Sequence, residues 1–297
     1  MKDYRFLKRS EIDKQKWNAL QQKYAKGLPY ANSWYLDAVC DNWNIIIYKD
    51  YEAGFVFQIN RKLGIPYSLH PFLIQQLGFF GTDHNILENM LSLIQKKVFH
   101  YHYHLNYFNN YTKDISRIAI NHELLLDKTY EESKLLYKTN TKRNLKKSYA
   151  NQLVVTIEQE FSESDNAFVL KNSKINFTED RLKKFSNLMR NANQNKALEI
   201  YRIEQNRNTV AMAIFIRNNK RAVYLIAINT EEGKKLKANF LLLDTFIKNN
   251  SESSLILDFE GSNIEGISRF YKGFGAIEEK YNIIKKNTCK NLFNKLL

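Results

Sequence analysis

The sequence is poor in the residues that form disulfide bonds and flexible linkers. Its 297 residues include two cysteines, three prolines and ten glycines. Cys40 and Cys289 are too few for a disulfide framework and have no metal-ligand spacing. No apolar run approaches the roughly 18 residues that a spanning helix needs, and the first residues lack the apolar region of a signal peptide. These absences predict a cytoplasmic protein without a membrane span.

Several catalytic motifs are absent as well. The sequence contains no Walker loop, no Rossmann fingerprint and no Gly-x-Ser-x-Gly. What it does contain is ample apolar material, with 44% hydrophobic and 13% aromatic residues, and a length near that of two domains. The net charge of +14 is spread over both halves of the chain. Such a charge favours contact with polyanions such as nucleic acid, phosphorylated carriers or an anionic membrane face.

The stretch from Leu255 to Ala276 combines a predicted strand with a predicted helix. Residues 255–260 form an apolar run that ends in alternation, which is typical of a strand. Ser262 and Glu265 have the spacing of a capping box, and apolar residues then recur at helical spacing as far as Gly273. A strand that turns into a helix places helix-start N–H groups beside the strand's last side chains. Open α/β sheets bind ligands at that edge.

This stretch resembles the end of the second domain of FemABX-type transferases, which belong to the wider GNAT superfamily of acyltransferases. The resemblance is carried by DFEGS at 258–262 and RFYKGFG at 269–275. A second match, KTNTKRNLKKSYANQL at 138–153, resembles the basic helix that enters that domain. The resemblance implies transfer of an acyl or aminoacyl group onto an amine acceptor, for example a cell-wall precursor or a carrier-linked substrate.

The order of the predicted elements indicates an α/β (α+β) fold with two tandem GNAT-like domains, each a mixed, mostly antiparallel sheet flanked by helices. Residues 1–135 are predicted as helices, a meander of strands that includes 72–80, a helix and a strand. No glycine-rich phosphate loop precedes the helix at His84, so we expect no donor site there. Residues 136–297 are predicted as a GNAT domain entered by the basic helix, with a later helix over 234–248.

The loop from Asn229 to Ala238 lies where a GNAT domain binds the phosphates of its donor. N–H groups at a helix start and nearby lysines favour an anion. Two adjacent glutamates and a single glycine depart from the acetyl-CoA signature, so acyl-CoA and aminoacyl-tRNA both remain candidate donors. A solvated charged turn is the alternative interpretation. The residues predicted to bind the donor are Asn229, Gly233, Lys234 and Lys235.

Four basic residues of the basic helix fall at i, i+4 spacing and form a stripe of like charge: Lys142, Arg143, Lys146 and Lys147. Like charges at this spacing are unfavourable without a counter-anion. We therefore predict that Arg143 and Lys147 contact a phosphate-bearing substrate or an RNA backbone, with tRNA as a candidate partner. A solvated face of an interdomain helix is the alternative.

Three residues are predicted to act in catalysis. By the resemblance, Lys272 and its aromatic neighbour Tyr271 correspond to a Phe-Lys pair whose lysine stabilises charge at the reacting ester. Asp258 and Glu260 share one strand face, and a carboxylate at a sheet edge is able to accept the proton of an attacking amine. The alternatives are a lysine that complements the helix dipole and a hydrogen-bonded structural aspartate.

The amine acceptor is expected in a cleft between the domains, with Lys272 on one side. The residues predicted to bound the other side are Trp34, Tyr35, Gln75 and Gln76. Two other functions stay open: a non-catalytic phosphate- or RNA-binding module on the same fold, and an acetyl-CoA-dependent N-acetyltransferase.

Three histidines alternate along a predicted strand, at His100, His102 and His104. Imidazole suits zinc or copper. Alternate side chains of one strand are nearly parallel, however, and do not surround an ion. We therefore expect no metal site and a half-exposed polar strand face.

Overall fold

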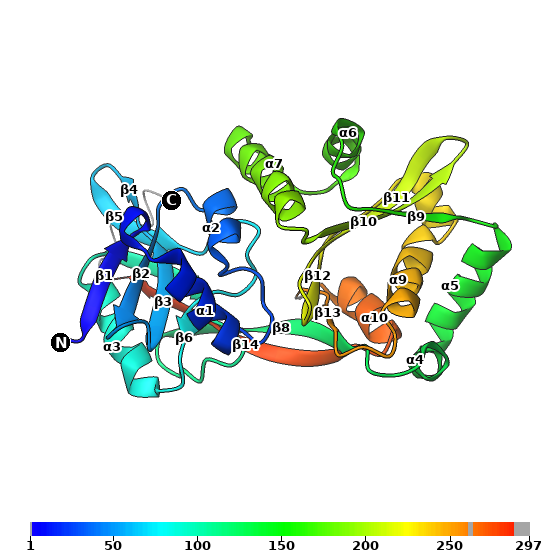
Figure 1. The fold of residues 1–297 in the computed structure, drawn as a ribbon. Helices are drawn as coiled ribbons and strands as arrows, with labels where there is room; N and C mark the ends of the chain where they lie inside the picture. Colours follow the sequence, from blue (N-terminus) through cyan, green and yellow to red (C-terminus); the bar gives the residue numbers. More distant parts are fainter. Residues whose placement is uncertain (1, 261–263, 288–297) are drawn as a thin grey trace. The chain divides into compact units, whose positions relative to one another are not determined.

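The computed structural model describes residues 2–260 and 264–287, and the chain divides into two compact units (Figure 1). Unit 1 holds the residues up to Ala119 and those from Lys280 onward, and unit 2 spans Ile120–Glu279. The last strand, Ile277–Asn287, therefore begins in unit 2 and continues in unit 1 from Lys280. Among the described residues, none of the helices combines the length and apolarity needed to cross a membrane.

Unit 1 contains a four-stranded sheet in the order β1-β2-β3-β6 and a second set of strands in the order β4-β5-β7-β14. Apolar side chains of α3 pack on buried aromatic residues of β3 and β7. The elements are β1 (Tyr4–Lys8), η1 (Arg9–Glu11), α1 (Lys14–Tyr24), α2 (Ser33–Val39), β2 (Trp43–Tyr48), β3 (Ala53–Gln58), β4 (Asn60–Lys62), β5 (Ile65–Leu69), β6 (Phe79–Phe80), α3 (His84–Gln95), β7 (His100–His104), and the adjoining parts of β8 (Ile115–Leu125) and β14 (Ile277–Asn287).

Unit 2 is built on a sheet in the order β8-β13-β12-β11-β10-β9. Helix α9 packs on one face of this sheet, and α6 and α7 lie on the other (Figure 1). The elements are α4 (Tyr130–Leu136), α5 (Thr139–Ala150), β9 (Val155–Glu158), α6 (Glu163–Asn172), α7 (Glu179–Gln194), β10 (Leu198–Gln205), β11 (Asn208–Arg217), β12 (Arg221–Asn229), α8 (Glu231–Lys235), α9 (Ala238–Asn249), β13 (Ile256–Asp258) and α10 (Glu265–Gly273).

The mixed, mostly antiparallel sheets and flanking helices confirm the predicted fold class. Three local predictions were wrong. The strand expected over 72–80 is limited to Phe79–Phe80, because residues 70–77 form a loop held to β7 by side-chain hydrogen bonds. Helix α10 begins at Glu265 after Ile264, so Glu265 is the first helical residue and not the third residue of a capping box. Ser262 itself lies outside the described residues.

The third correction concerns the helix expected over 234–248. It is two helices, because Lys237 adopts a left-handed conformation with φ of 60° between α8 and α9. Thr230 caps α8 by accepting the N–H of Gly233, and Gly233 lies against the backbone of Val210. A Cβ at Gly233 would lie 2.2 Å from the carbonyl oxygen of Val210. The absence of a side chain at Gly233 therefore lets α8 approach the sheet.

Substituting Gly233 with alanine should destabilise the protein by about 1–3 kcal/mol, because the new methyl group has no space against Val210. Gly266→Ala is the matched control: its Cβ meets no atom within 4 Å, and alanine favours the helix by up to about 1 kcal/mol. Urea unfolding of both variants measures the difference. Equal effects would contradict the close approach of α8.

The loop of residues 70–77 in unit 1 is held by two stacked histidines. The rings of His70 and His104 lie 4.0 Å apart at 13°. His70 Nδ1 accepts the backbone N–H of His104, so its Nε2 donates to the carbonyl of Ile74. His104 Nδ1 donates to the carbonyl of Gln75 at 3.1 Å. Burial lowers the pKa of His104 to about 4 and that of His70 well below its ordinary value.

The histidines of β7 do not form a metal cluster with one another. His100 is buried beside Asn287, and burial lowers its pKa to about 4. The expected half-exposed histidine face is therefore wrong for His100 and holds for His102 and His104, which are partly buried. Within residues 2–260 and 264–287, no group of three or more His, Cys, Asp or Glu side chains is arranged to hold a metal ion.

Because the fold keeps these histidines neutral, their contribution to stability should be complete above pH 6.5 and should fall as the pH drops toward 4. His104→Asn keeps an N–H donor for Gln75 but does not titrate, so it should flatten the pH dependence. His84→Asn, on the surface, should not. Urea unfolding at several pH values tests this. A slope that His104→Asn leaves unchanged would contradict it.

Candidate functional site

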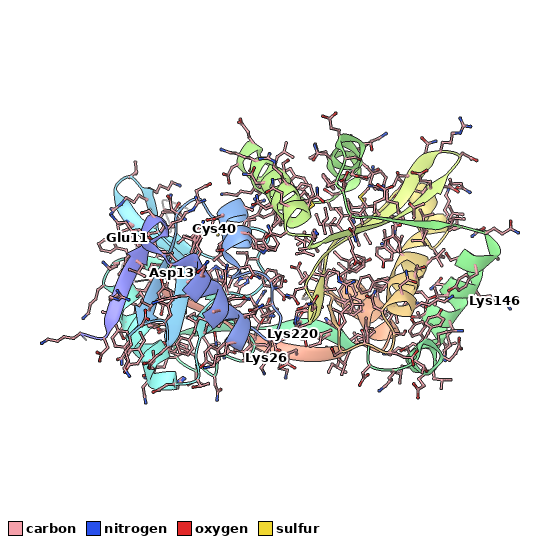
Figure 2. All side chains as sticks on the ribbon, in the orientation of Figure 1. Glu11, Asp13, Lys26, Cys40, Lys146 and Lys220 are labelled. Carbon is pink, nitrogen blue, oxygen red and sulfur yellow. The ribbon has the colours of Figure 1, made fainter. Side chains whose placement is uncertain are left out.

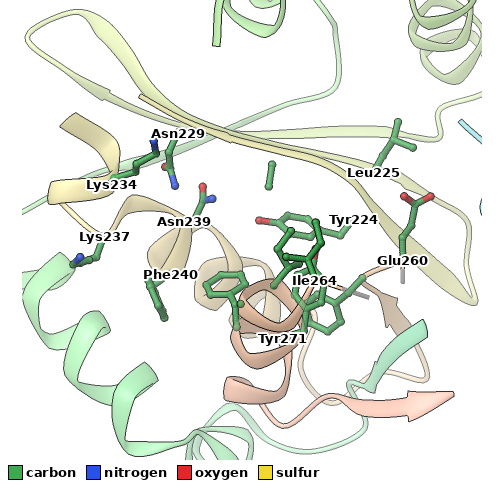
Figure 3. Close-up of a pocket in the computed structure, with 15 residues that line it drawn as sticks. Tyr224, Leu225, Asn229, Lys234, Lys237, Asn239, Phe240, Glu260, Ile264 and Tyr271 are labelled. Carbon is green, nitrogen blue, oxygen red and sulfur yellow. The ribbon is translucent and has the colours of Figure 1, made fainter. Parts of the chain in front are cut away.

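A cavity of about 580 Å³ opens in unit 2 where two parallel strands separate (Figure 3). Strands β12 and β13 pair through Arg221, Ala222 and Val223, and β13 then ends at Asp258 while β12 continues to Asn229. The second half of β12 still pairs with β11 on one edge, but among the described residues no strand continues β13 along its other edge, and there it forms one wall of the cavity. The cavity thus lies at the carboxyl ends of parallel strands, the usual ligand position in open α/β sheets.

A β-bulge lies in the same part of β12. Ile214 of β11 pairs with Ile226, whereas the next residue, Phe215, pairs with Tyr224, so Leu225 is an extra residue on β12. A bulge bends its strand and leaves the extra residue out of the regular ladder. Tyr224 and Leu225 both line the cavity, so the bulge adjusts the wall that a ligand would contact.

Aromatic rings form one end of the cavity. Phe259 stacks on Tyr271 with centroids 4.6 Å apart, and Phe240 meets Phe270 edge-on at 4.9 Å. Tyr224 contacts both Phe259 and Tyr271. Burial raises the pKa of Tyr224, and burial together with the carboxylates of Glu260 and Asp258 raises that of Tyr271. Both phenols therefore stay protonated at neutral pH and are available as hydrogen-bond donors.

Amide and ammonium groups form the other end. Asn229 and Lys234 reach it from the β12–α8 connection, and Lys237 and Asn239 reach it from the start of α9. Figure 3 shows the side chains of Asn229 and Asn239 close together. The first N–H groups of an α-helix lack intrahelical partners and carry partial positive charge. This end of the cavity therefore suits an anionic or carbonyl-rich part of a ligand.

Three polar atoms of the cavity lining are buried without a hydrogen bond. Tyr224 Oη, Asn229 Oδ1 and Asn239 Oδ1 find no partner among the described residues. A buried polar group left unpaired costs about 1–3 kcal/mol, and buried polar groups are usually satisfied. These atoms make the cavity a candidate site for a ligand with several polar groups.

The predicted donor loop is brought to the cavity only in part. Asn229 and Lys234 line it, while Gly233, within α8, packs against the backbone of Val210. Lys235 is exposed and pairs with Glu232 at 3.8 Å. The glutamates of the loop each pair with a lysine three residues later, which offsets their repulsion of an anion.

Of the two predicted carboxylate bases, Glu260 lines the cavity and Asp258 supports the strand end. Asp258 is completely buried and accepts a hydrogen bond from Arg221 Nη1 at 2.6 Å. Its other oxygen accepts the N–H of Glu260 at 2.9 Å, and Glu260 adopts a left-handed φ of 54°. Arg221 also pairs with Glu123 of β8 at 2.6 Å. This arrangement is that of a hydrogen-bonded structural aspartate, the alternative interpretation of Asp258.

Lys272 and Tyr271 lie next to each other on α10 but have different surroundings. Tyr271 lines the cavity, whereas Lys272 is absent from the lining and pairs with Glu278. Glu278 also lies 3.9 Å from His122 Nε2, which contacts Ser268. The predicted role of Lys272 at the reacting carbonyl stays a prediction, and it requires the lysine to leave Glu278.

The remaining predicted residues lie away from this cavity. Arg143 and Lys147 are exposed on α5, and Arg143 donates to Asn140 Oδ1. In unit 1, Tyr35 is buried and donates to the carbonyl of Leu73. Trp34 contacts Tyr35, and Gln76 is buried, accepts the N–H of Tyr107 and donates to Gln75. The acceptor cleft proposed for these residues stays a prediction.

The sequence prediction missed most of the cavity lining. Tyr224, Phe240, Phe270 and Asn239 line the cavity and are not among the site residues that the sequence predicts. One signal was present for Tyr224, which is a lone hydroxyl in the otherwise apolar run 222–228. The position of Asn239 follows from the helix break at Lys237, which no turn residue indicates.

Asp258→Ala should destabilise the protein by about 3–5 kcal/mol, because it leaves the buried Arg221 guanidinium without one of its carboxylates. Glu265→Ala breaks an exposed pair with Arg269 and should change stability by no more than the error of measurement. Urea unfolding of both variants gives the comparison. Similar small effects would mean that the buried pair does not hold the strands.

The chain is similar to several known proteins in fold. Residues 140–265 match the family model of an acetyltransferase (GNAT) domain. FemX superposes with a TM-score of 0.68 at 10% identity, over 96% of this chain and 98% of FemX. L-PGS from Bacillus licheniformis gives 0.56 at 13% identity, over 96% and 95%. A tandem GNAT protein from the clavulanic acid biosynthesis pathway gives 0.56 at 9% identity, over 96% and 98%. No curated protein matches the sequence.

The resemblance inferred from residues 258–275 and 138–153 is therefore confirmed by comparisons that extend over both units. The position of the cavity agrees with it in part: the lining from Tyr224 to Ile264 lies inside the part of the chain that the GNAT model matches, and the lining residues of α10 follow directly after it. Residues 140–265 thus match a GNAT acetyltransferase domain, and the chain as a whole shares its fold with FemX and with a tandem GNAT protein.

Proposed function

We propose that the protein transfers an aminoacyl group, or a related acyl group, from an activated donor in the unit 2 cavity onto an amine. The observation that carries this proposal is the set of buried, unpartnered oxygens of Tyr224, Asn229 and Asn239 in the gap between β12 and β13. A donor that enters beside α9 would satisfy these groups. Its carbonyl would then lie near the bulge at Leu225.

The reaction needs little covalent help from the protein. The amine nitrogen attacks the carbonyl carbon, the bond from that carbon to the leaving oxygen or sulfur breaks, and the leaving atom takes the electron pair. One proton is removed from the amine and one is supplied to the leaving atom. Positioning and stabilisation of the developing oxyanion carry most of the rate.

Two cavity residues suit these proton steps. Tyr224 is protonated at neutral pH because burial raises its pKa, so its hydroxyl is a donor for the oxyanion or the leaving atom. Glu260 is a carboxylate on the cavity wall and is suited to accept the proton of the amine. Tyr224 is better placed than Lys272 for the first role, since Lys272 pairs with Glu278 and does not line the cavity.

An aminoacyl donor is favoured over a plain acyl donor for two reasons. The cavity has ammonium groups at one end and the carboxylate of Glu260 on the wall near Leu225, so it suits a ligand that is anionic at one end and carries an ammonium group at the other. Structural likeness to FemX and to L-PGS supports aminoacyl transfer.

Acetyl-CoA-dependent N-acetylation is the second candidate function. It is favoured by the match of residues 140–265 to an acetyltransferase domain. The lysine at the start of α9 and the asparagines of the cavity suit the phosphates and amides of coenzyme A as well as those of a nucleotide-linked donor. Binding measurements with the two donor classes separate these possibilities.

Isothermal titration with acetyl-CoA and with a non-hydrolysable aminoacyl-adenosine amide tests the proposal. We expect the second ligand to bind, and Asn239→Ala to weaken it roughly 5–10-fold through loss of one hydrogen bond. With a turnover assay in hand, Tyr224→Phe should slow transfer by roughly 10²-fold.

Tyr201→Phe is the matched control, because Tyr201 is a buried tyrosine of unit 2 that does not line the cavity. It should leave binding and transfer unchanged. Tight binding of acetyl-CoA with no binding of the aminoacyl ligand would favour the acetyltransferase. Absence of binding by both ligands, or equal binding by wild type and Asn239→Ala, would reject the cavity as the donor site.

A further inference from the structure

One surface of unit 2 combines unpaired positive charge with exposed leucines. It is formed by the end of α4 and the outward side of α5, and we call it the α4–α5 surface. Figure 2 shows one of its members, Lys146, projecting from α5 away from the sheet of this unit. The residues of the α4–α5 surface are Leu135, Leu136, Lys138, Lys142, Arg143, Lys146 and Lys147, all of them exposed.

Within the described part of the chain, ion pairs do not neutralise the positive charge of this surface. Helix α5 contains no acidic residue. Among the described residues, no carboxylate lies within 4.0 Å of the basic groups of Lys142, Arg143, Lys146 or Lys147. Their i, i+4 spacing is unfavourable in the free protein. On the neighbouring α4, Glu131 pairs with Lys134 at 3.2 Å, and the carboxylate of Glu132 accepts hydrogen bonds from Thr129 at the start of the helix. This surface therefore favours an anionic partner.

An anionic partner alone does not explain why two leucines are exposed on this surface. Leu135 is 77% exposed and Leu136 is 48% exposed. Lys142 Nζ lies 3.3 Å from the carbonyl oxygen of Leu135, which places the charge and the apolar side chains side by side. Burial of these two adjacent leucines against a partner would be favourable by about 25 cal/mol for each Å² of apolar surface removed from water.

The outward position of the leucines is fixed by contacts on the other side of α4. Tyr130 donates to the buried carboxylate of Asp244 at 2.7 Å, and Tyr149 of α5 bonds to the same oxygen. Tyr137, directly after α4, packs on Phe274 with ring centroids 5.1 Å apart. Helix α4 is therefore anchored by other residues, and its leucines are held at the surface next to the basic helix.

We propose that the α4–α5 surface docks the protein on an anionic lipid bilayer. Basic residues attract anionic head groups, and adjacent leucines enter the interface between head groups and acyl chains. RNA would also satisfy the basic residues through its phosphates. It offers no apolar phase for aliphatic side chains, so the leucines favour the bilayer.

This docking surface belongs to a helix that contacts the cavity helices. Lys138 donates its N–H to the carbonyl of Gly273 at the end of α10, and Thr141 lies against the same glycine. Helix α5 also packs on α9, whose first residues line the cavity. Docking would hold unit 2 at a membrane surface through the same helices that shape its binding site.

Sedimentation with lipid vesicles tests the proposal on the full chain. We expect binding to vesicles of phosphatidylcholine mixed with phosphatidylglycerol, little binding to pure phosphatidylcholine, and weakening by salt. Replacing Lys142, Arg143, Lys146 and Lys147 with alanine should reduce binding by roughly tenfold or more. Leu135→Ser with Leu136→Ser, which leaves the charge unchanged, should reduce it about fivefold.

A variant with the same loss of charge elsewhere in unit 2 is the control, with Lys183, Arg190, Lys196 and Lys220 changed to alanine. It should bind vesicles like the wild type, and thermal unfolding should show that all variants are folded. Equal loss in the control variant would overturn the proposal, since net charge alone would then explain binding. So would binding of a single-stranded RNA oligonucleotide that depends on the basic residues but not on the leucines, in the absence of vesicle binding.

Discussion

The site of unit 2 depends on a buried ion pair between Arg221 and Asp258. Both side chains are completely buried; Arg221 belongs to the first residue pair between β12 and β13, and Asp258 belongs to the last pair before the strands separate. Arg221 also holds Glu123 of β8, so one guanidinium ties three strands together. Removing one partner would leave a buried charge uncompensated, which is far more costly than losing an exposed pair. The pair therefore fixes the strand ends from which Phe259 and Glu260 reach the cavity.

Where β12 and β13 have separated, apolar side chains do not fill the space between them, and polar groups there are left without hydrogen bonds. Aromatic side chains pack one end of the cavity densely, while Tyr224, Asn229 and Asn239 keep oxygens without partners among the described residues. A packed interior would have replaced these groups with apolar ones, because unpaired buried polar atoms reduce stability. Their presence at the separated strands is the physical reason for placing a ligand there.

Polar contacts also hold the helices that surround the cavity. Asp244 of α9 is buried and accepts hydrogen bonds from tyrosines of α4 and α5. This carboxylate links the outer helices to the helix whose first turn lines the cavity. The outward faces of α4 and α5 take no part in these contacts with Asp244, so their leucines and lysines are available for an external partner.

The sequence by itself determined the elements whose signals are local. Helical periodicity ending at Gly273 predicted α10, and the basic run after Lys138 predicted α5 and its exposed stripe. Tertiary structure alone decided the site. The left-handed residue Lys237, which breaks a continuous helical pattern, carries no turn signal, and the burial of Asp258 depends on a guanidinium 37 residues away. The point where β12 and β13 separate decides which side chains meet at the cavity. Long-range strand pairing and buried charge set that point, and local periodicity contains no information about either.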